Sequence, residues 1–137
     1  MYPRVMSSVS DSAEQVAATF VIDLKPGVAD IDGTARFDFT KSWVGGMEGV
    51  SRGQMLSAGD PSLGNAGYIA IEMFEGTIAG RRGKVAMQQF GTMRAGEYVL
   101  RYELAPGSGT NELAGIVGGI DLTIVDGKHE VILRYEV

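Results

Sequence analysis

The stretch IDLTIVDGKHEVILRY, residues 120–135, decides the fold of this chain. Its Asp-Gly pair lies between two runs in which apolar and polar residues alternate, and this arrangement is among the strongest short-range signals for a β-hairpin. We expect Val125 to pair with Lys128 across the turn. One face of the hairpin then carries the apolar side chains together with the only histidine, His129, near the turn.

The same period of two recurs upstream. Val16, Phe20 and Leu24 share one face of the first run, and Phe37 and Trp43 share one face of the second, as in strands with one buried side. Residues 13–19 have helix propensity, but this segment is short and runs into β-branched residues. We therefore expect strands in the ranges 13–27, 33–46, 47–59, 67–80, 84–93, 96–105, 112–125 and 128–137.

Eight long strands joined mostly by short turns predict an all-β fold. An eight-stranded antiparallel up-and-down barrel removes sheet edges that would otherwise aggregate, and it fits a chain of 137 residues. A two-sheet sandwich is the alternative. We expect a single barrel domain at residues 13–137, preceded by a polar arm at residues 1–12. The 20 glycines are about twice the usual share of roughly 7%, which suggests bulged and closely approaching strands.

The glycine-rich stretch FEGTIAGRRGKV, residues 74–85, has two interpretations. A phosphate-binding loop has Gly-Lys followed by Ser or Thr at the start of a helix, whereas here Val85 follows the lysine and a strand pattern comes next. A hairpin explains the stretch better. We expect a three-residue loop closed by Gly80 and Lys84, which places Phe74 opposite Phe90.

Composition narrows the classes of function. The net charge of −5 and the pI of about 4.8 argue against a nucleic-acid partner. No apolar run reaches the ~18 residues of a membrane span, and residues 1–12 lack the apolar segment of a secretory signal, so we expect a cytoplasmic protein with no membrane partner. The absence of cysteine and the single histidine exclude disulfides, thiolate catalysis and metal cages built from Cys or His. We expect no metal and no cofactor.

Glu72 is the candidate for acid–base catalysis, because it lies inside the apolar strand YIAIEMF. It shares a face with Tyr68, Ala70 and Phe74, and either face of this strand can point inward. A carboxylate buried in this way is a candidate acid or base. The alternatives are an ion pair with an arginine inside the barrel and a carboxylate that faces outward.

A second polar set supplies candidate ligand-binding residues. Glu48 and Arg52 share a face with apolar residues on the third strand, and Gln88 does so on the fifth. Such a set predicts either a hydrogen-bond network inside the barrel or an interface between subunits. Tyr102 is expected to pack inside, with its hydroxyl bonded to a partner. His129 is either a hydrogen-bonded histidine at one mouth of the barrel or a general base or ligand donor.

Four strings occur together in this chain: GYIAIEMFEGTIAGRRG, QQFGTM, PGSGTNELAGIVG and DGKH. As a set they resemble a bacterial family described as domain of unknown function 3224, over roughly residues 13–137. That family is similar to the allene oxide cyclase barrels, with dirigent proteins as more distant relatives. The resemblance implies an eight-stranded antiparallel barrel, often a homo-oligomer. The better-known relatives hold an apolar reactive intermediate and steer its cyclisation or coupling, and none of their catalytic residues is carried over here.

Two hypotheses for the function follow. In the first, the barrel binds a small, largely apolar molecule and assists an isomerisation or cyclisation, with Glu72 as the acid or base. Arg52 and Gln88 then orient the ligand, with His129 at the mouth. In the second, aromatic side chains fill the barrel, and the protein acts without catalysis through oligomerisation or partner binding. We expect a homo-oligomer.

Overall fold

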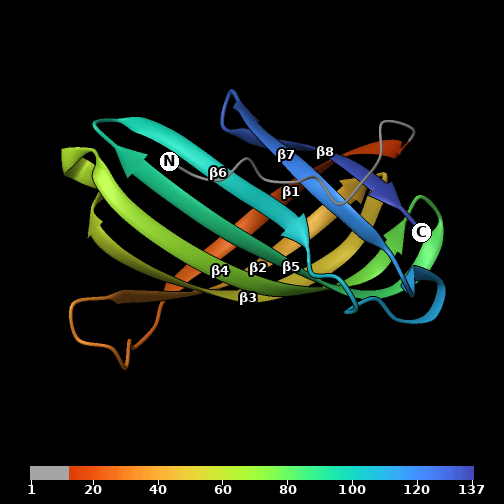
Figure 1. Ribbon diagram of the computed structural model, residues 1–137, viewed down its shortest axis with the longest axis horizontal. Helices are drawn as coiled ribbons and strands as arrows, with labels where there is room; N and C mark the ends of the chain where they lie inside the picture. The colour runs from red at the N-terminus through yellow and green to blue at the C-terminus, as the bar shows by residue number, and fades with distance from the viewer. Residues whose placement is uncertain (1–12) are drawn as a thin grey trace.

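The structure is a closed barrel of eight antiparallel strands that follow one another in sequence order (Figure 1). The computed structural model describes residues 13–137, so the predicted arm lies outside the described residues. The predicted barrel is confirmed, and the sandwich is not formed. No helix among these residues is long and apolar enough to cross a membrane. The elements are β1 (Glu14–Pro26), β2 (Ala35–Gly45), β3 (Met47–Asp60), η1 (Pro61–Leu63), β4 (Asn65–Ile78), β5 (Arg81–Arg94), β6 (Glu97–Leu104), η2 (Asn111–Leu113), β7 (Val117–Val125) and β8 (Lys128–Glu136).

The β7–β8 hairpin has the predicted register. Val125 pairs with Lys128, and His129 lies opposite a residue of the inward face of β7. Asp126 and Gly127 have φ angles of 51° and 76°, as a two-residue type I′ turn requires. The predicted hairpin and its register are therefore confirmed. This type of turn forms here because its twist matches the twist of the two strands that it joins.

The β4–β5 hairpin differs from its predicted register. Its turn consists of the two residues Ala79 and Gly80, rather than the three-residue loop that we expected. Both have positive φ, 50° and 81°, so this is again the kind of turn whose twist matches the strands. Phe74 therefore lies opposite Val85 instead of Phe90. A strand follows the glycines, as the hairpin interpretation requires.

One end of the barrel interior, which we call the lumen, is closed by the loop between β6 and β7. Leu113 and Ile116 in this loop are fully buried in the core. The Thr110 amide donates to the carbonyl of Lys84 at 2.9 Å, and the Thr110 hydroxyl accepts from the Lys84 amide at 3.0 Å. Glycine is needed at position 109, because a Cβ there would lie 1.9 Å from the carbonyl oxygen of Leu113. Strand residues that fill this half of the lumen include Met47, Phe74, Ile78, Leu104 and Leu133.

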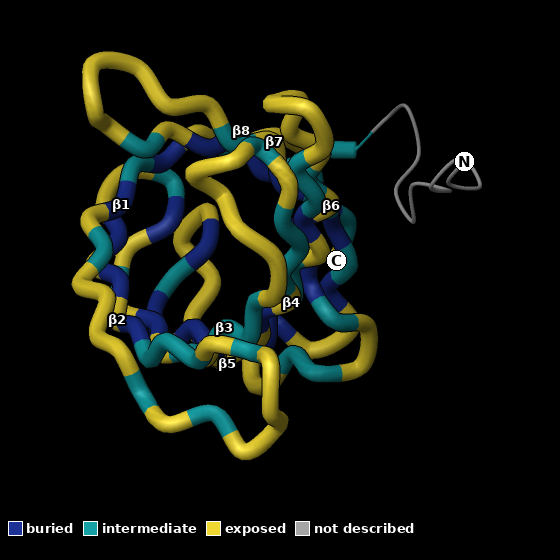
Figure 2. Tube along the Cα trace, turned by 90° about the vertical axis from the view of Figure 1, so that its left-hand side faces the viewer, coloured by how far each residue is buried: buried dark blue, intermediate teal, exposed yellow. Residues whose placement is uncertain are grey.

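The other end of the lumen, which we call the mouth, is less completely filled. Buried and exposed positions alternate along the strands (Figure 2), but several inward positions near the mouth depart from this pattern. At the rim, Leu24, Tyr98 and Ile124 are 46%, 51% and 61% exposed. Deeper inside, five apolar side chains that we call the mouth set are half-buried: Ile22, Phe37, Met55, Leu100 and Leu122.

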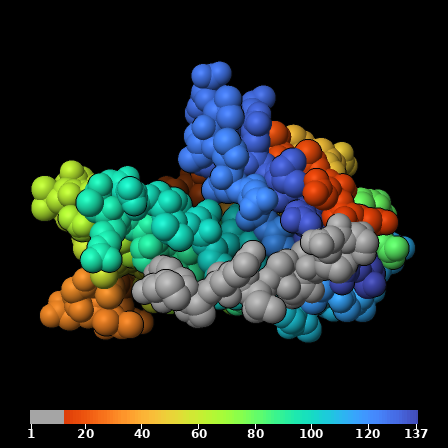
Figure 3. All heavy atoms as spheres, turned by 45° about the horizontal axis from the view of Figure 1, so that its top comes forward, coloured from red at the N-terminus to blue at the C-terminus, as the bar shows by residue number. Residues whose placement is uncertain are grey.

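The barrel wall is weakest between β6 and β7. Among the described residues a single pair, Glu103 with Gly119, joins these strands, whereas pairs run along the whole length of β6 on its β5 side. The two strands diverge toward the mouth (Figure 1), and the β7–β8 hairpin stands away from the β5–β6 hairpin (Figure 3). We call this weakly paired part of the wall the seam.

We expect the loop that contains η2 to contribute much of the stability of the closed end of the barrel. Leu113→Ala should lower the free energy of unfolding by about 2–5 kcal/mol, because it empties a fully buried site. The same substitution at Leu63, which is 74% exposed, should change it by less than about 0.5 kcal/mol. Urea denaturation of both variants measures the difference, and equal losses would contradict this assignment.

Candidate functional site

A buried polar network lies between the filled half of the lumen and the half nearer the mouth. Lys41 on β2, Ser51 on β3, Glu72 on β4 and Tyr102 on β6 supply it, and Lys41 and Glu72 are only 3% and 2% exposed. Strand alternation points all four inward, and on β6 Tyr102 lies between a half-buried and a fully buried leucine. A charge in such an interior is stable only with a partner.

The hydrogen bonds of the network satisfy both carboxylate oxygens. The Lys41 ammonium donates to Glu72 Oε1 at 2.7 Å and to the Tyr102 hydroxyl at 3.0 Å. The Tyr102 hydroxyl donates to the same Oε1 at 2.7 Å. Ser51 Oγ donates to Glu72 Oε2 at 2.5 Å and accepts from Trp43 Nε1 at 3.0 Å. The carboxylate thus accepts three hydrogen bonds from three strands.

Aromatic rings enclose the ammonium group of Lys41. Its Nζ lies 4.4 Å from the ring centre of Phe20, 5.1 Å from those of Phe39 and Tyr102, and 5.5 Å from that of Trp43. The negative faces of such rings attract a cation, more strongly where water is excluded. The rings therefore offset part of the cost of burying the charge.

Burial dominates the protonation of the network. It lowers the pKa of Lys41, and the nearby Glu72 carboxylate opposes this shift. Burial also raises the pKa of Tyr102 well above its usual value, and the charge of Glu72 adds to the effect. Tyr102 is therefore protonated at neutral pH and available as a hydrogen-bond donor.

A second polar group lies nearer the mouth. The Tyr68 hydroxyl donates to Gln89 Oε1 at 2.8 Å and lies 2.6 Å from the Tyr98 hydroxyl. Burial and the hydrogen bond with Tyr98 raise the pKa of Tyr68. His129 stacks on Phe20, with ring centres 4.8 Å apart.

The structure brings together part of the predicted site. Glu72 and Tyr102 both point inward and are bonded to each other, while His129 is half-buried at the turn end of the lumen. The inward alternative for Glu72 is the one that forms, although its partner is a lysine instead of an arginine. Arg52 and Glu48 point to the outer face of β3 and are exposed.

Gln88 also lies on the outer face, on β5. Its side-chain amide is 3.4 Å from Glu103 Oε1. The polar set of Arg52, Glu48 and Gln88 therefore lies outside the lumen, and the predicted hydrogen-bond network of these residues inside the barrel does not form. The other alternative, an interface between subunits, stays a prediction. Within residues 13–137 no group of three or more His, Asp or Glu side chains could hold a metal ion.

Sequence reasoning missed Lys41 and Ser51. The position of Lys41 was the signal that could have identified it, because Lys41 lies between Phe39 and Trp43 on the same, apolar face of its strand. A lysine on that face requires a buried anion, and Glu72 is the acidic residue inside an apolar strand. Ser51 lies in a run whose alternation is too irregular to mark an inward hydroxyl.

The ion pair should show strong coupling in a double-mutant cycle. We expect Lys41→Met and Glu72→Leu each to cost about 3–5 kcal/mol of unfolding free energy, because each leaves a buried charge without its partner. The double variant should be more stable than either single one. Lys25→Met is the control, since Lys25 forms an exposed pair with Asp23 and should lose less than about 1 kcal/mol. Additive losses in the Lys41 and Glu72 cycle would contradict the coupling.

Alkaline pH should destabilise the fold through Tyr102. Its pKa is raised above the usual 10.0, so the stability it contributes is complete below pH 10.0 and is lost as the pH rises further, when only the unfolded chain releases the proton. Urea midpoints of the wild type should therefore fall above pH 10.0, and those of Tyr102→Phe should fall less steeply. Parallel curves for the two proteins would show that this hydroxyl ionises normally.

Comparisons with known proteins agree with the fold. The family model described as "Protein of unknown function (DUF3224)" matches residues 14–135. The chain is also similar to a solved structure of a protein of unknown function from the DUF3224 family of Shewanella oneidensis MR-1, at 34% identity and a TM-score of 0.85. That alignment covers 91% of this chain and 97% of the other. No match was found among curated proteins.

The match spans nearly the whole barrel, including all four strings on which the predicted resemblance rested. The further similarity to allene oxide cyclase barrels stays a prediction. The resemblance to the family is confirmed at the level of both sequence and structure, and the chain belongs to the DUF3224 family of proteins of unknown function.

Proposed function

We propose that the lumen binds a small, largely apolar molecule in the half nearer the mouth. The observation that carries this proposal is the incomplete burial of the mouth set, whose side chains point inward and are still half-buried. Inward positions of a barrel filled by its own side chains are buried, as they are at the closed end. A ligand that covers the mouth set gains roughly 25 cal/mol for each Å² of apolar surface removed from water.

Polar groups lead from the mouth toward the buried network. Tyr98, Tyr68 and Gln89 form a chain of hydrogen bonds, and Gln89 pairs with Tyr102 across β5 and β6. One polar end of a ligand can exchange hydrogen bonds with these groups while its apolar body contacts the mouth set. This combination favours a molecule with a carbonyl or hydroxyl group on an apolar skeleton.

In the catalytic form of the proposal, the network assists an isomerisation or cyclisation. Glu72 acts as the acid or base, and Tyr102 passes the proton between Glu72 and the ligand. Lys41 stabilises negative charge that develops on the tyrosine oxygen. Confinement of the ligand and the fixed dipoles of the network supply the rate gain. His129 contacts the ligand near the mouth.

A different observation favours a second function. Each polar side-chain atom of the network has a partner inside the protein, as in a polar core that serves structure alone. In this alternative the barrel is not an enzyme, and the protein acts through contacts with other subunits or proteins. Ligand binding distinguishes the two functions.

The binding proposal is tested with the neutral fluorescent probe N-phenyl-1-naphthylamine. Leu100→Trp places a bulky indole ring in the half of the lumen nearer the mouth. Because this ring occupies the space proposed for the ligand, it should weaken probe binding at least ~10-fold. Val99→Trp is the matched control, because Val99 is the preceding residue of β6 and points outward with 55% exposure. The control should bind the probe as the wild type does.

Mass spectrometry of the purified protein, native and then denatured, gives an independent result. A small apolar compound released on denaturation from the wild type, and reduced in Leu100→Trp, supports binding in the lumen. Equal probe affinity of the two tryptophan variants, with no compound released, would overturn the proposal in favour of the filled barrel.

A further inference from the structure

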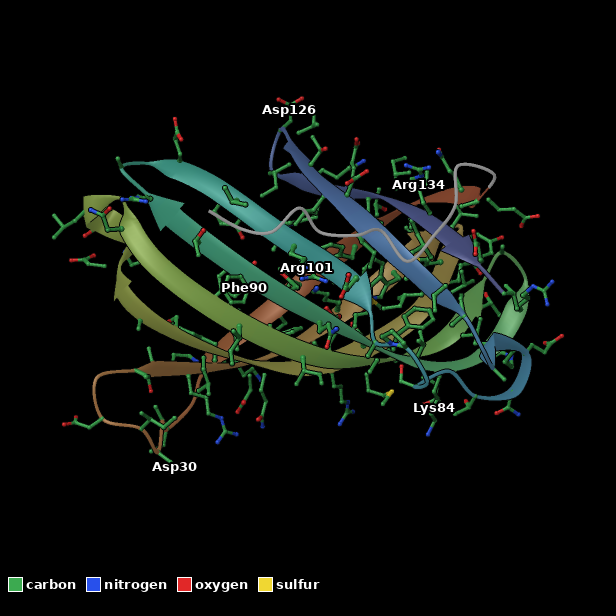
Figure 4. The ribbon with its side chains drawn as sticks, viewed as in Figure 1. Asp30, Lys84, Phe90, Arg101, Asp126 and Arg134 are labelled. Carbon is green, nitrogen blue, oxygen red and sulfur yellow. The ribbon has the colours of Figure 1, made fainter. Side chains whose placement is uncertain are left out.

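The outer face of β3 to β6 carries an apolar groove. Its volume is about 550 Å³, and its lining includes Leu56, Ile69, Ile71, Phe90 and Arg101. Three successive outward residues of β4, Ile69, Ile71 and Met73, are 53%, 58% and 47% exposed. Phe90 on β5 and Arg101 on β6 lie near each other on this side of the barrel (Figure 4). A contiguous apolar patch of this kind marks an interaction surface.

The charges on this face follow the strand register. Pairing across the strands produces two neighbouring rows of outward side chains. The first row is Leu56, Ile69, Phe90 and Arg101, and the second row is Gln54, Ile71, Gln88 and Glu103. The β6 end is thus positive in the first row and negative in the second, and the two groups lie 3.2 Å apart within one chain.

We propose that this face is the interface of a homodimer whose two-fold axis runs across the strands, between the two rows. Rotation about this axis places each row against the other row of the second copy. Ile69 then packs on Ile71 of the partner subunit, and Arg101 lies against Glu103 of the partner subunit. The apolar centre and the charged edge are both self-complementary, as a two-fold interface requires.

The charge pattern selects this axis over the other two-fold arrangement. An axis parallel to the strands would place Arg101 against Leu56 of β3 in the second copy, which offers no anion. The proposed axis instead adds a carboxylate of the second copy to the one that Arg101 already contacts in its own chain. On the other flank, Arg36 and Asp38 of β2 pair with Leu56 and Gln54 and extend the two rows. Their order is again positive in the first row and negative in the second.

The first test is sedimentation velocity across a concentration series. We expect the wild type to dimerise and Ile71→Glu to weaken dimerisation at least ~100-fold, because it buries an unpaired carboxylate at the centre of the interface. Val44→Glu is the matched control, since Val44 is 61% exposed on β2 outside the two rows, and it should dimerise as the wild type does. Circular dichroism checks that each variant is folded.

The second test reads the orientation of the two copies. Arg101→Glu alone and Glu103→Arg alone should each dimerise at least ~10-fold more weakly, because like charges then meet across the axis. An equimolar mixture of the two variants should restore the dimer, since one copy supplies two carboxylates and the other two guanidinium groups.

Three results would overturn the proposal. The first is a wild type that remains a monomer throughout the series. The second is a dimer that Ile71→Glu leaves intact, which would place the interface on another face. The third is a mixture of the charge variants that dimerises no better than either variant alone. None of these results depends on whether the lumen binds a ligand.

Discussion

The buried ion pair between Lys41 and Glu72 is the interaction on which the interior of this barrel depends. Closing the sheet removes both groups from water, and neither could stay there alone without a large desolvation cost. Ser51, Tyr102 and the surrounding rings complete the hydrogen bonds and the cation–π contacts. The network forms only when four strands keep their register, because a slip of one residue turns an inward side chain outward.

The network also divides the lumen into halves with different consequences. Below it, the loop that carries η2 closes the barrel, and side chains fill the space. Above it, a single residue pair joins β6 and β7 at the seam, and the mouth set is only half-buried. In the function that we propose, a molecule that enters from the mouth contacts the apolar mouth set and the hydroxyl groups of Tyr98 and Tyr68 before it reaches the network.

Strand alternation lets one strand serve both the interior and the outer face. On β4, Glu72 belongs to the buried network, while its neighbours Ile71 and Met73 lie in the exposed apolar patch. Both faces of this strand are largely apolar: one packs in the core, and the other forms the exposed patch that we propose as a dimer interface. Because both faces of β4 are apolar, the sequence did not indicate which face of this strand points inward.

The sequence by itself determined the elements and much of their pairing. Alternation and the Asp-Gly turn are local signals, so the eight strands, the barrel and the β7–β8 register were predictable from them. It could not identify Lys41 as the partner of Glu72, which lies 31 residues away, nor place Arg52 outside the lumen. A period of two shows which residues share a face, but only closure of the sheet against its neighbours decides which face is buried, and with it which charges must pair.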